Sequence, residues 1–118
     1  MITWNNLDKL TSYQELKKTE SVDLAAVMAG ENGAERVKNY SVPMAEGLAY
    51  NYAAKKVDDT VLAALEKLAE EAQLTEKFEA LYNGEVVNTG EKRLVLHHMT
   101  RGQLGDAVEA DGVDKRTF

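Results

Sequence analysis

Apolar residues recur near helical spacing at the beginning of the chain. The four that define this first stripe are Trp4, Leu7, Leu10 and Leu16. Their spacing favours a helix over residues 3–19. Thr11, followed three positions later by Gln14, has the form of a capping box, which would restart or bend the helix at that point.

A second, shorter apolar run follows a pair of residues that commonly cap helices. Ser21 and Asp23 precede this run, which continues to Met28, so we expect a short helix there. The sequence Gly30-Glu31-Asn32-Gly33 then ends the helix, because glycine and asparagine tolerate positive φ. No alternating strands flank Asn32-Gly33, so we interpret this stretch as a helix stop and loop.

From Arg36 to Ala53 the pattern changes to a period of two. Tyr40 and Val42 alternate with polar or small residues in one run, and Leu48, Tyr50 and Tyr52 do so in the other. Turn residues Pro43 and Gly47 separate the runs, so we predict a β-hairpin near residues 37–53. Tyrosines on one strand face can stack on a sugar or base, but we favour packing against a helix.

The clearest helix begins at Asp58 or Asp59. Its apolar stripe consists of Val61, Leu62, Leu65, Leu68, Ala69 and Ala72. Burying each large aliphatic side chain is worth about 1.5 to 3 kcal/mol, and an isolated helix of this length is marginal in water. We therefore expect the stripe to pack on the hairpin or on another helix. A shorter helix follows from Thr75 to Tyr82, and Asn83-Gly84 ends it.

These elements predict a mostly α fold with one small β-hairpin, in the α+β class. We expect residues 1–118 to form a single helical and hairpin segment. Beyond Arg101 the glycines alternate with Asp and Val without a periodic element, and no apolar segment closes the chain at Phe118. We therefore expect a chain that is truncated after Phe118.

Charge and composition exclude several classes of function. The net charge of −6 arises between Asp58 and Glu85, where there are eight acidic residues and only two lysines. We interpret this acidic stretch as a solvated helix face. The lysines and arginines are scattered, which disfavours nucleic-acid binding. The chain has no cysteine and no long apolar run, so we expect a cytoplasmic protein without disulfides or a membrane span.

The only histidines are adjacent, at positions 97 and 98. Neighbouring residues point to different faces of a helix or strand, so the two cannot chelate one metal ion without distortion. His97 could act as a general acid or base, but no nucleophile surrounds it. We favour a structural role, with His97 at least half buried and hydrogen-bonded into a corner formed by Glu91 and Arg93. We expect Arg93 or Arg101 to pair with a carboxylate there.

The segment around these histidines resembles a known family signature. Its spacing is Asn88-x-x-Glu91-x-Arg93-x-Val95-Leu96-His97-x-x-x-Arg101, preceded by Gly84-Glu85. It is similar to the N-terminal signature of glucose-6-phosphate isomerases, and it departs from that signature at Gly90, Leu94 and Met99-Thr100. The short apolar run Leu94-Val95-Leu96 suits a strand or a helix equally well. The resemblance implies a helix over Arg93 to Met99.

The resemblance extends upstream. Glu35-Arg36 followed by Tyr40-Ser41 resembles one family motif, and Gly47-Leu48 through Asn51-Tyr52 resembles another, in which Asn51 replaces an aspartate. The similarity covers residues 34–101. Family members are several hundred residues long, so the resemblance implies that this chain corresponds to an N-terminal piece.

The family's reaction interconverts glucose 6-phosphate and fructose 6-phosphate in glycolysis and gluconeogenesis. The motifs that carry this reaction lie C-terminal to the matched region, so the resemblance assigns no catalytic, substrate-binding or metal-binding residue here and implies no cofactor. The expected partners are the rest of the isomerase chain and a second subunit of a homodimer, with sugar phosphate bound only by the full-length protein. The signature residues expected to be structural are Gly84, Glu85, Asn88, Glu91, Arg93, His97 and Arg101.

Two other functions remain open. A free-standing helical interaction module would use the helix from Asp58 to Ala72 as its binding face. A small stand-alone enzyme would depend on His97, which we consider the weakest of the three hypotheses.

Overall fold

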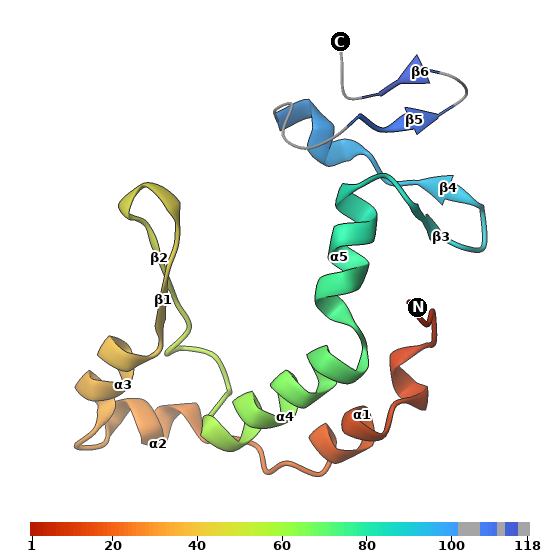
Figure 1. The fold of residues 1–118 in the computed structure, drawn as a ribbon. Coiled ribbons are helices and arrows are strands. Elements are labelled where there is room, and N and C mark those ends of the chain that lie inside the picture. The colour runs from red at the N-terminus through yellow and green to blue at the C-terminus, as the bar shows by residue number, and fades with distance from the viewer. Residues whose placement is uncertain (102–106, 111–112, 116–118) are drawn as a thin grey trace. The chain divides into compact units, whose positions relative to one another are not determined.

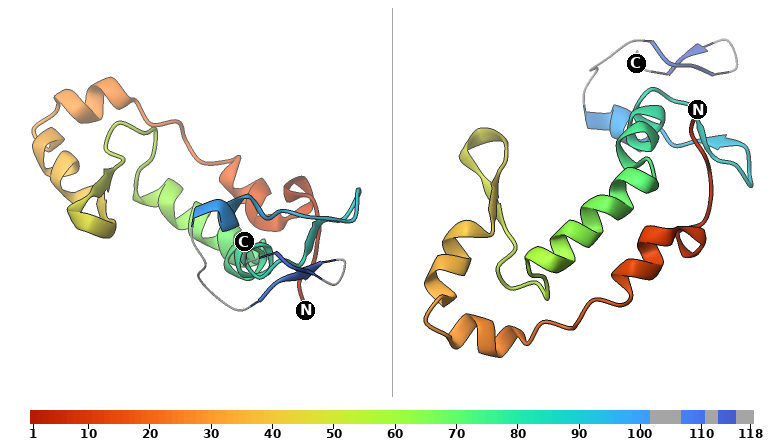
Figure 2. Two further views of the ribbon diagram at one scale, coloured as in Figure 1. Left: turned by 90° about the horizontal axis from the view of Figure 1, so that it is seen from above. Right: turned by 60° about the horizontal axis from the view of Figure 1, so that its bottom comes forward.

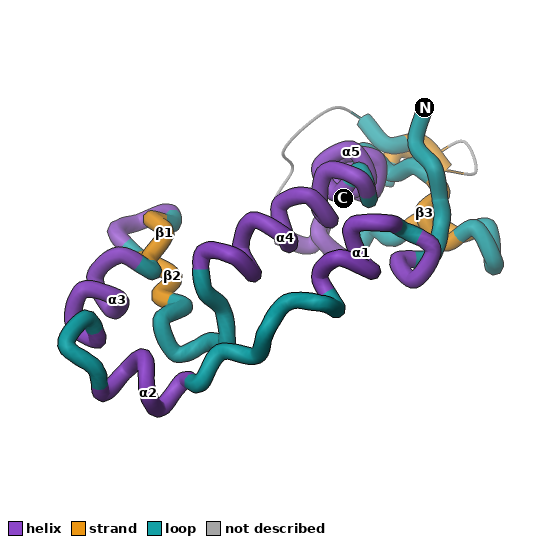
Figure 3. The backbone as a smooth tube through the Cα atoms, turned by 90° about the horizontal axis from the view of Figure 1, so that it is seen from below, coloured by secondary structure: helices purple, strands orange, loops and turns teal. Residues whose placement is uncertain are grey.

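The computed structural model describes residues 1–101, 107–110 and 113–115. The chain divides into two compact units. We call Asp8–Leu68 the helix-hairpin unit, and Met1–Leu7 together with Ala69–Phe118 the signature unit. Helices and loops make up most of the described backbone and the strands are short (Figure 3). The prediction of a mixed α+β fold is confirmed.

The first helix is shorter than the sequence predicts. A 3-10 helix covers Leu7–Lys9 and α1 covers only Thr11–Leu16. Leu10, not Thr11, occupies the N-cap position of α1, and its extended backbone (ψ 139°) interrupts the helix. The helix therefore restarts at this point as predicted, but Thr11 does not occupy the N-cap position that a capping box requires. The side chain of Gln14 instead donates to the carbonyl of Asp8 (2.9 Å).

The second helix forms as predicted, but another helix follows it. Helix α2 covers Leu24–Ala29, and the Asp23 carboxylate accepts from the Ala26 amide (3.1 Å). Helix α3 covers Gly33–Asn39 and meets α2 at an angle in both views of Figure 2. The expected loop and the expected strand from Arg36 are wrong here, since Ala, Glu, Arg and Lys of this segment are good helix formers.

The predicted β-hairpin is present (Figure 1). Strand β1 (Ser41–Pro43) pairs antiparallel with β2 (Ala49–Asn51), and Val42 lies opposite Tyr50. A 3-10 turn at Ala45–Gly47 connects them. A two-stranded hairpin is marginal by itself in water, so its surroundings must stabilise it.

Helix α4 covers Asp59–Glu71, and Asp58 caps it by accepting from the Val61 amide (2.8 Å), as predicted. Gln73 takes a left-handed conformation (φ 52°) and separates α4 from α5, which covers Leu74–Tyr82. The Gln73 side chain also holds the N-terminal segment of the signature unit. It accepts from the Thr3 amide (2.8 Å) and donates to the Met1 carbonyl (3.2 Å).

The signature unit continues from α5 through short strands. Strand β3 (Val86–Asn88) pairs with β4 (Arg93–Leu94), and a 3-10 helix covers His97–Arg101. Strand β5 (Glu109–Ala110) pairs with β6 (Val113–Asp114), so the prediction of no regular element beyond Arg101 is wrong. The Asp114 carboxylate supports this pair by accepting from the Val108 amide (3.2 Å).

The described residues have few deeply buried side chains. The buried apolar residues are Leu10, Val22, Ala53, Ala72, Ala80, Met99 and Val108. None of the large side chains described is less than 2% exposed, whereas Leu48, Leu74 and Phe78 are each at least 60% exposed. No helix in the described ranges is long and apolar enough to span a membrane.

Candidate functional site

The signature segment starts where α5 ends. The Gly84 amide donates to Leu81 O (3.2 Å) and the Glu85 amide donates to Ala80 O (2.8 Å). This pair of bonds, with Gly84 at φ 76°, is a Schellman motif that satisfies the last carbonyls of the helix. A Cβ atom at Gly84 would overlap Cγ1 of the buried Val108. Glycine is therefore required here for two reasons, its backbone conformation and the space available.

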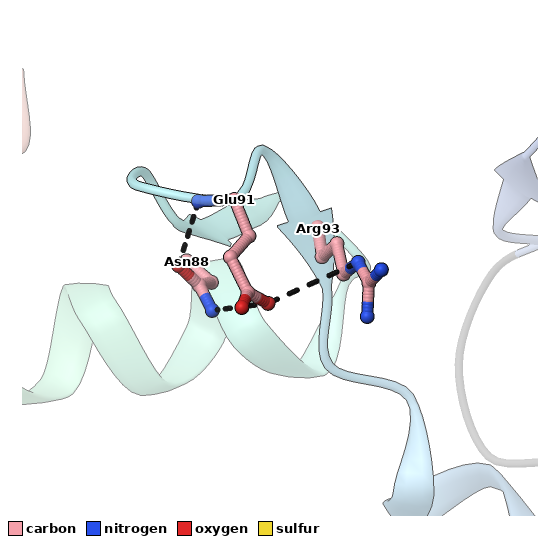
Figure 4. A network of polar contacts seen from close by, with 3 residues as sticks. All are labelled: Asn88, Glu91 and Arg93. Carbon is pink, nitrogen blue, oxygen red and sulfur yellow. Dashed lines mark hydrogen bonds and ion pairs between the residues drawn. The ribbon is translucent and has the colours of Figure 1, made fainter.

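A polar network closes the turn between β3 and β4 (Figure 4). The Asn88 side chain accepts from the Glu91 amide (3.1 Å) and donates to Glu91 Oε2 (3.3 Å). Arg93 Nε lies 3.8 Å from the same Oε2 atom, which confirms the expected pairing of Arg93 with a carboxylate. The Arg93 and Glu91 side chains are 78% and 63% exposed, so water screens the pair.

We expect Arg93→Ala to change the free energy of unfolding by less than about 1 kcal/mol, the usual range for an exposed ion pair. The larger loss that a buried pair would give does not apply, because both groups remain solvated. Urea denaturation of the two proteins tests this. A loss of several kcal/mol would show that Arg93 is covered in solution.

The two histidines differ in their surroundings. His97 is exposed, and in the described ranges no hydrogen bond joins its side chain to Glu91 or Arg93. His98 is half-buried, its Nε2 lies 3.0 Å from Tyr82 O, and its ring stacks on Tyr82 with centroids 4.9 Å apart. The expected role of His97 in the corner is therefore corrected. His98 is the histidine that ties this segment to α5.

His98→Ala should lower the free energy of unfolding by about 1 to 3 kcal/mol, because it removes a hydrogen bond and an aromatic contact together. His97→Ala, its matched control, should change it by less than about 0.5 kcal/mol, as at an exposed position. Chemical denaturation of both variants measures the difference. Equal effects would contradict the assignment of His98.

The helix that the resemblance implies over Arg93 to Met99 is wrong. Arg93 and Leu94 form strand β4, and helical structure begins only at His97. Lys92 has φ 55°, a left-handed conformation that turns the chain back toward β3. The Arg101 side chain, for which we expected a carboxylate partner, lies outside the described residues.

The helix-hairpin unit contains a second polar cluster, centred on Arg36. Its guanidinium donates to three backbone carbonyls in the segment after β2: Ala53 O (2.9 Å), Lys55 O (3.0 Å) and Val57 O (2.8 Å). The Arg36 guanidinium also lies over the Tyr40 ring, 4.4 Å from its centroid. One side chain of α3 therefore fixes the path of the connection between the hairpin and α4.

Two neighbours reinforce this cluster. The Tyr40 hydroxyl donates to Asp59 Oδ1 (3.0 Å); burial and then this hydrogen bond raise the pKa of the Tyr40 phenol. Asn51 Nδ2 donates to Val37 O (2.6 Å), while its Oδ1 accepts from the Ala53 amide (3.0 Å). An aspartate, the residue of the family motif at this position, has no donor for the Val37 carbonyl when ionised.

Both clusters use their polar groups to hold the local backbone. Asn88, His98 and Arg36 each bond to main-chain atoms of a neighbouring element. In the described ranges, no three carboxylate or imidazole groups come together as a metal site would need. The hydrogen bonds of both clusters fix local backbone geometry.

Comparison with known proteins identifies the family to which these residues belong. A family model described as phosphoglucose isomerase matches residues 51–117 of this chain. The glucose-6-phosphate isomerase of Treponema denticola is 52% identical over 120 residues, which cover 98% of this chain. The chain belongs to the phosphoglucose isomerase family. The enzymes of that name from Borreliella afzelii (37% identical, 100% of this chain) and Treponema pallidum strain Nichols (45%, 85% of this chain) also match.

The chain spans about a fifth of the length of these phosphoglucose isomerases: 23% of the Treponema denticola enzyme, 22% of the Borreliella afzelii enzyme and 19% of the Treponema pallidum enzyme. The family model covers the whole signature segment from Gly84 to Arg101, but it begins at Asn51 and leaves Arg36 outside. The alignments with the Treponema denticola and Borreliella afzelii enzymes, which cover 98% or more of the chain, include the Arg36 cluster as well. Both clusters therefore lie in the region shared with phosphoglucose isomerases.

The structure places the seven signature residues in different surroundings. Asn88, Glu91 and Arg93 form one network, and Gly84 and Glu85 form the end of α5. Sequence reasoning missed the roles of His98 and of the Arg36 side chain. A usable signal for Arg36 existed, because Tyr40 follows it one helical turn later, a spacing that lets a guanidinium stack on an aromatic ring.

Proposed function

We propose that this chain is the N-terminal structural part of a glucose-6-phosphate isomerase. In this proposal the complete enzyme interconverts glucose 6-phosphate and fructose 6-phosphate in glycolysis and gluconeogenesis, and these residues supply packing surface and no catalytic group. The observation that carries the proposal is 52% identity to such an enzyme over 98% of this chain and only 23% of that enzyme.

The site geometry supports a structural role. Aldose-ketose isomerisation moves a proton between C1 and C2, which requires a positioned base together with groups that open the sugar ring and hold the phosphate. Here the Arg36 guanidinium is occupied by three backbone carbonyls and His98 by Tyr82 O. The net charge of −6 also disfavours collecting a phosphate dianion on this chain alone.

The proposal extends to partners and location. The segment packs against the remainder of the isomerase chain and contributes to a homodimer in the cytoplasm, and sugar phosphate binds only to the complete enzyme. No cofactor is required for proton transfer between adjacent carbons of a sugar. The seven signature residues then serve to set the geometry of the packing surface.

The alternative is a free-standing helical interaction module. The observation that favours it is the exposure of large apolar residues on several elements, including Leu65 of α4 (39%) and Phe78 of α5 (63%). A module of this kind would bind its partner through the exposed apolar side of a helix. The two hypotheses differ in whether the segment has to be covalently continuous with a catalytic body.

We expect the purified 118-residue chain to show no isomerase activity in a coupled assay with glucose 6-phosphate, and no binding of that sugar by calorimetry. A chimera in which this chain replaces the aligned part of the Treponema denticola enzyme should be active. Turnover by the short chain that disappears in His97→Ala would overturn the proposal in favour of a stand-alone enzyme. An inactive but folded chimera would favour the interaction module.

A further inference from the structure

The helix-hairpin unit has an open apolar groove between the hairpin and α4. Val42, Tyr50 and Tyr52 line one side, and Leu62 and Leu65 of α4 line the other, with Val57 between them. The hollow has a volume of about 420 Å³, and Lys55 is the one charged residue of its lining. We call it the tyrosine groove.

The tyrosine groove is formed by ordered side chains that remain accessible. Tyr40, Tyr52 and Tyr50 stack in sequence, with ring centroids 5.1 and 6.2 Å apart. Nevertheless Val42 is 49%, Tyr50 50% and Leu65 39% exposed. Burying aromatic and aliphatic groups of this size is strongly favourable, so a groove lined this way is suited to receive apolar side chains.

We propose that the tyrosine groove receives a ridge of apolar side chains from the catalytic body of the same isomerase polypeptide. This inference rests on the proposed function. The relatives that match over this chain have more than three quarters of their residues outside the matched part, since it is 22–23% of their length. In a complete enzyme the remaining residues are the nearest source of such a ridge.

A second copy of the chain fits the tyrosine groove less well. A twofold contact through this face would place one hollow against another and leave both unfilled. An exposed ridge elsewhere on the copy, such as Phe78, would make a head-to-tail contact that leads to open-ended assembly.

The test uses the chimera with the Treponema denticola enzyme and measures nitration of Tyr50 by tetranitromethane, followed by peptide mass spectrometry. We expect nitration at least about ten-fold slower than in the urea-unfolded chimera. Leu65→Lys should raise the rate toward the unfolded value and lower the thermal midpoint by several degrees. Ala63→Lys, at an exposed position of the same helix with the same added charge, should do neither.

The activity of the chimera tests the proposed function, and the nitration of Tyr50 tests this inference. An active chimera whose Tyr50 reacts as fast as in the unfolded protein would overturn the inference alone. An inactive chimera with Tyr50 protected would overturn the proposed function alone. Two further results would also overturn the inference: equal effects of Ala63→Lys and Leu65→Lys, and protection of Tyr50 that is lost on dilution as subunits dissociate.

Discussion

Gly84→Ala should lower the free energy of unfolding by about 2 to 5 kcal/mol. About 1 to 2 kcal/mol arises because alanine is disfavoured at φ 76°, and about 1 to 3 kcal/mol more because the new methyl group would overlap Val108 Cγ1. Gly47 provides the matched control, since it has φ 74° and no atom lies within 4 Å of the position that a new methyl group would take. Gly47→Ala should therefore cost only about 1 to 2 kcal/mol.

A double substitution separates the two contributions at Gly84. Val108→Ala removes the methyl groups that a Cβ atom at residue 84 would overlap, so adding it to Gly84→Ala should cost less than the sum of the single changes by about 1 kcal/mol or more. Urea denaturation of the four proteins completes the cycle. Strict additivity would mean that the backbone conformation alone makes glycine necessary at this position.

The elements that could be predicted from the sequence are those with strong local signals. Helix α4 combines a clear apolar period with Asp58 as a cap, and α5 ends at Asn83-Gly84, a pair suited to the Schellman motif that forms. The hairpin is predictable because alternation and turn residues agree over β1 and β2. In each case local propensity and the final fold favour the same structure.

The elements that could not be predicted depend on contacts distant in sequence. Alternation of Tyr40 and Val42 suggests a strand from Arg36, yet residues 33–39 are helical. The helix places the Arg36 guanidinium where it donates hydrogen bonds to carbonyls 17 to 21 residues away. The apolar run Leu94-Val95-Leu96 suits a strand or a helix equally. Pairing of Leu94 with Val86 of β3 makes the start of this run a strand.

The spacing of the signature locates the candidate site, but it does not assign the role of each histidine. Adjacent residues point to different faces, so which of His97 and His98 meets α5 depends on the backbone that precedes them. The strand pairing of Leu94 with Val86 and the 3-10 turn that follows bring His98, and not His97, to Tyr82. A signature motif therefore identifies the segment more reliably than it identifies the side chain that holds it.

Arg36→Ala should lower the free energy of unfolding by about 2 to 4 kcal/mol, because it removes charge-assisted hydrogen bonds to three carbonyls. Ala53 is only 2% exposed, so water cannot readily replace the hydrogen bond that its carbonyl accepts from Arg36. Arg36→Lys should recover little of the loss, since one ammonium group cannot reproduce the planar fork that reaches all three oxygens.

Arg93→Ala is the matched control, because it removes the same side chain from a position where that side chain is 78% exposed. Urea denaturation measures the three variants, and amide hydrogen exchange locates the change. The Tyr52 amide, which donates to Tyr40 O (2.9 Å), should exchange faster in Arg36→Ala and at the original rate in Arg93→Ala. Equal losses of stability in the two alanine variants would contradict the view that Arg36 holds the hairpin connection, and full recovery by Arg36→Lys would reduce its role to that of a positive charge.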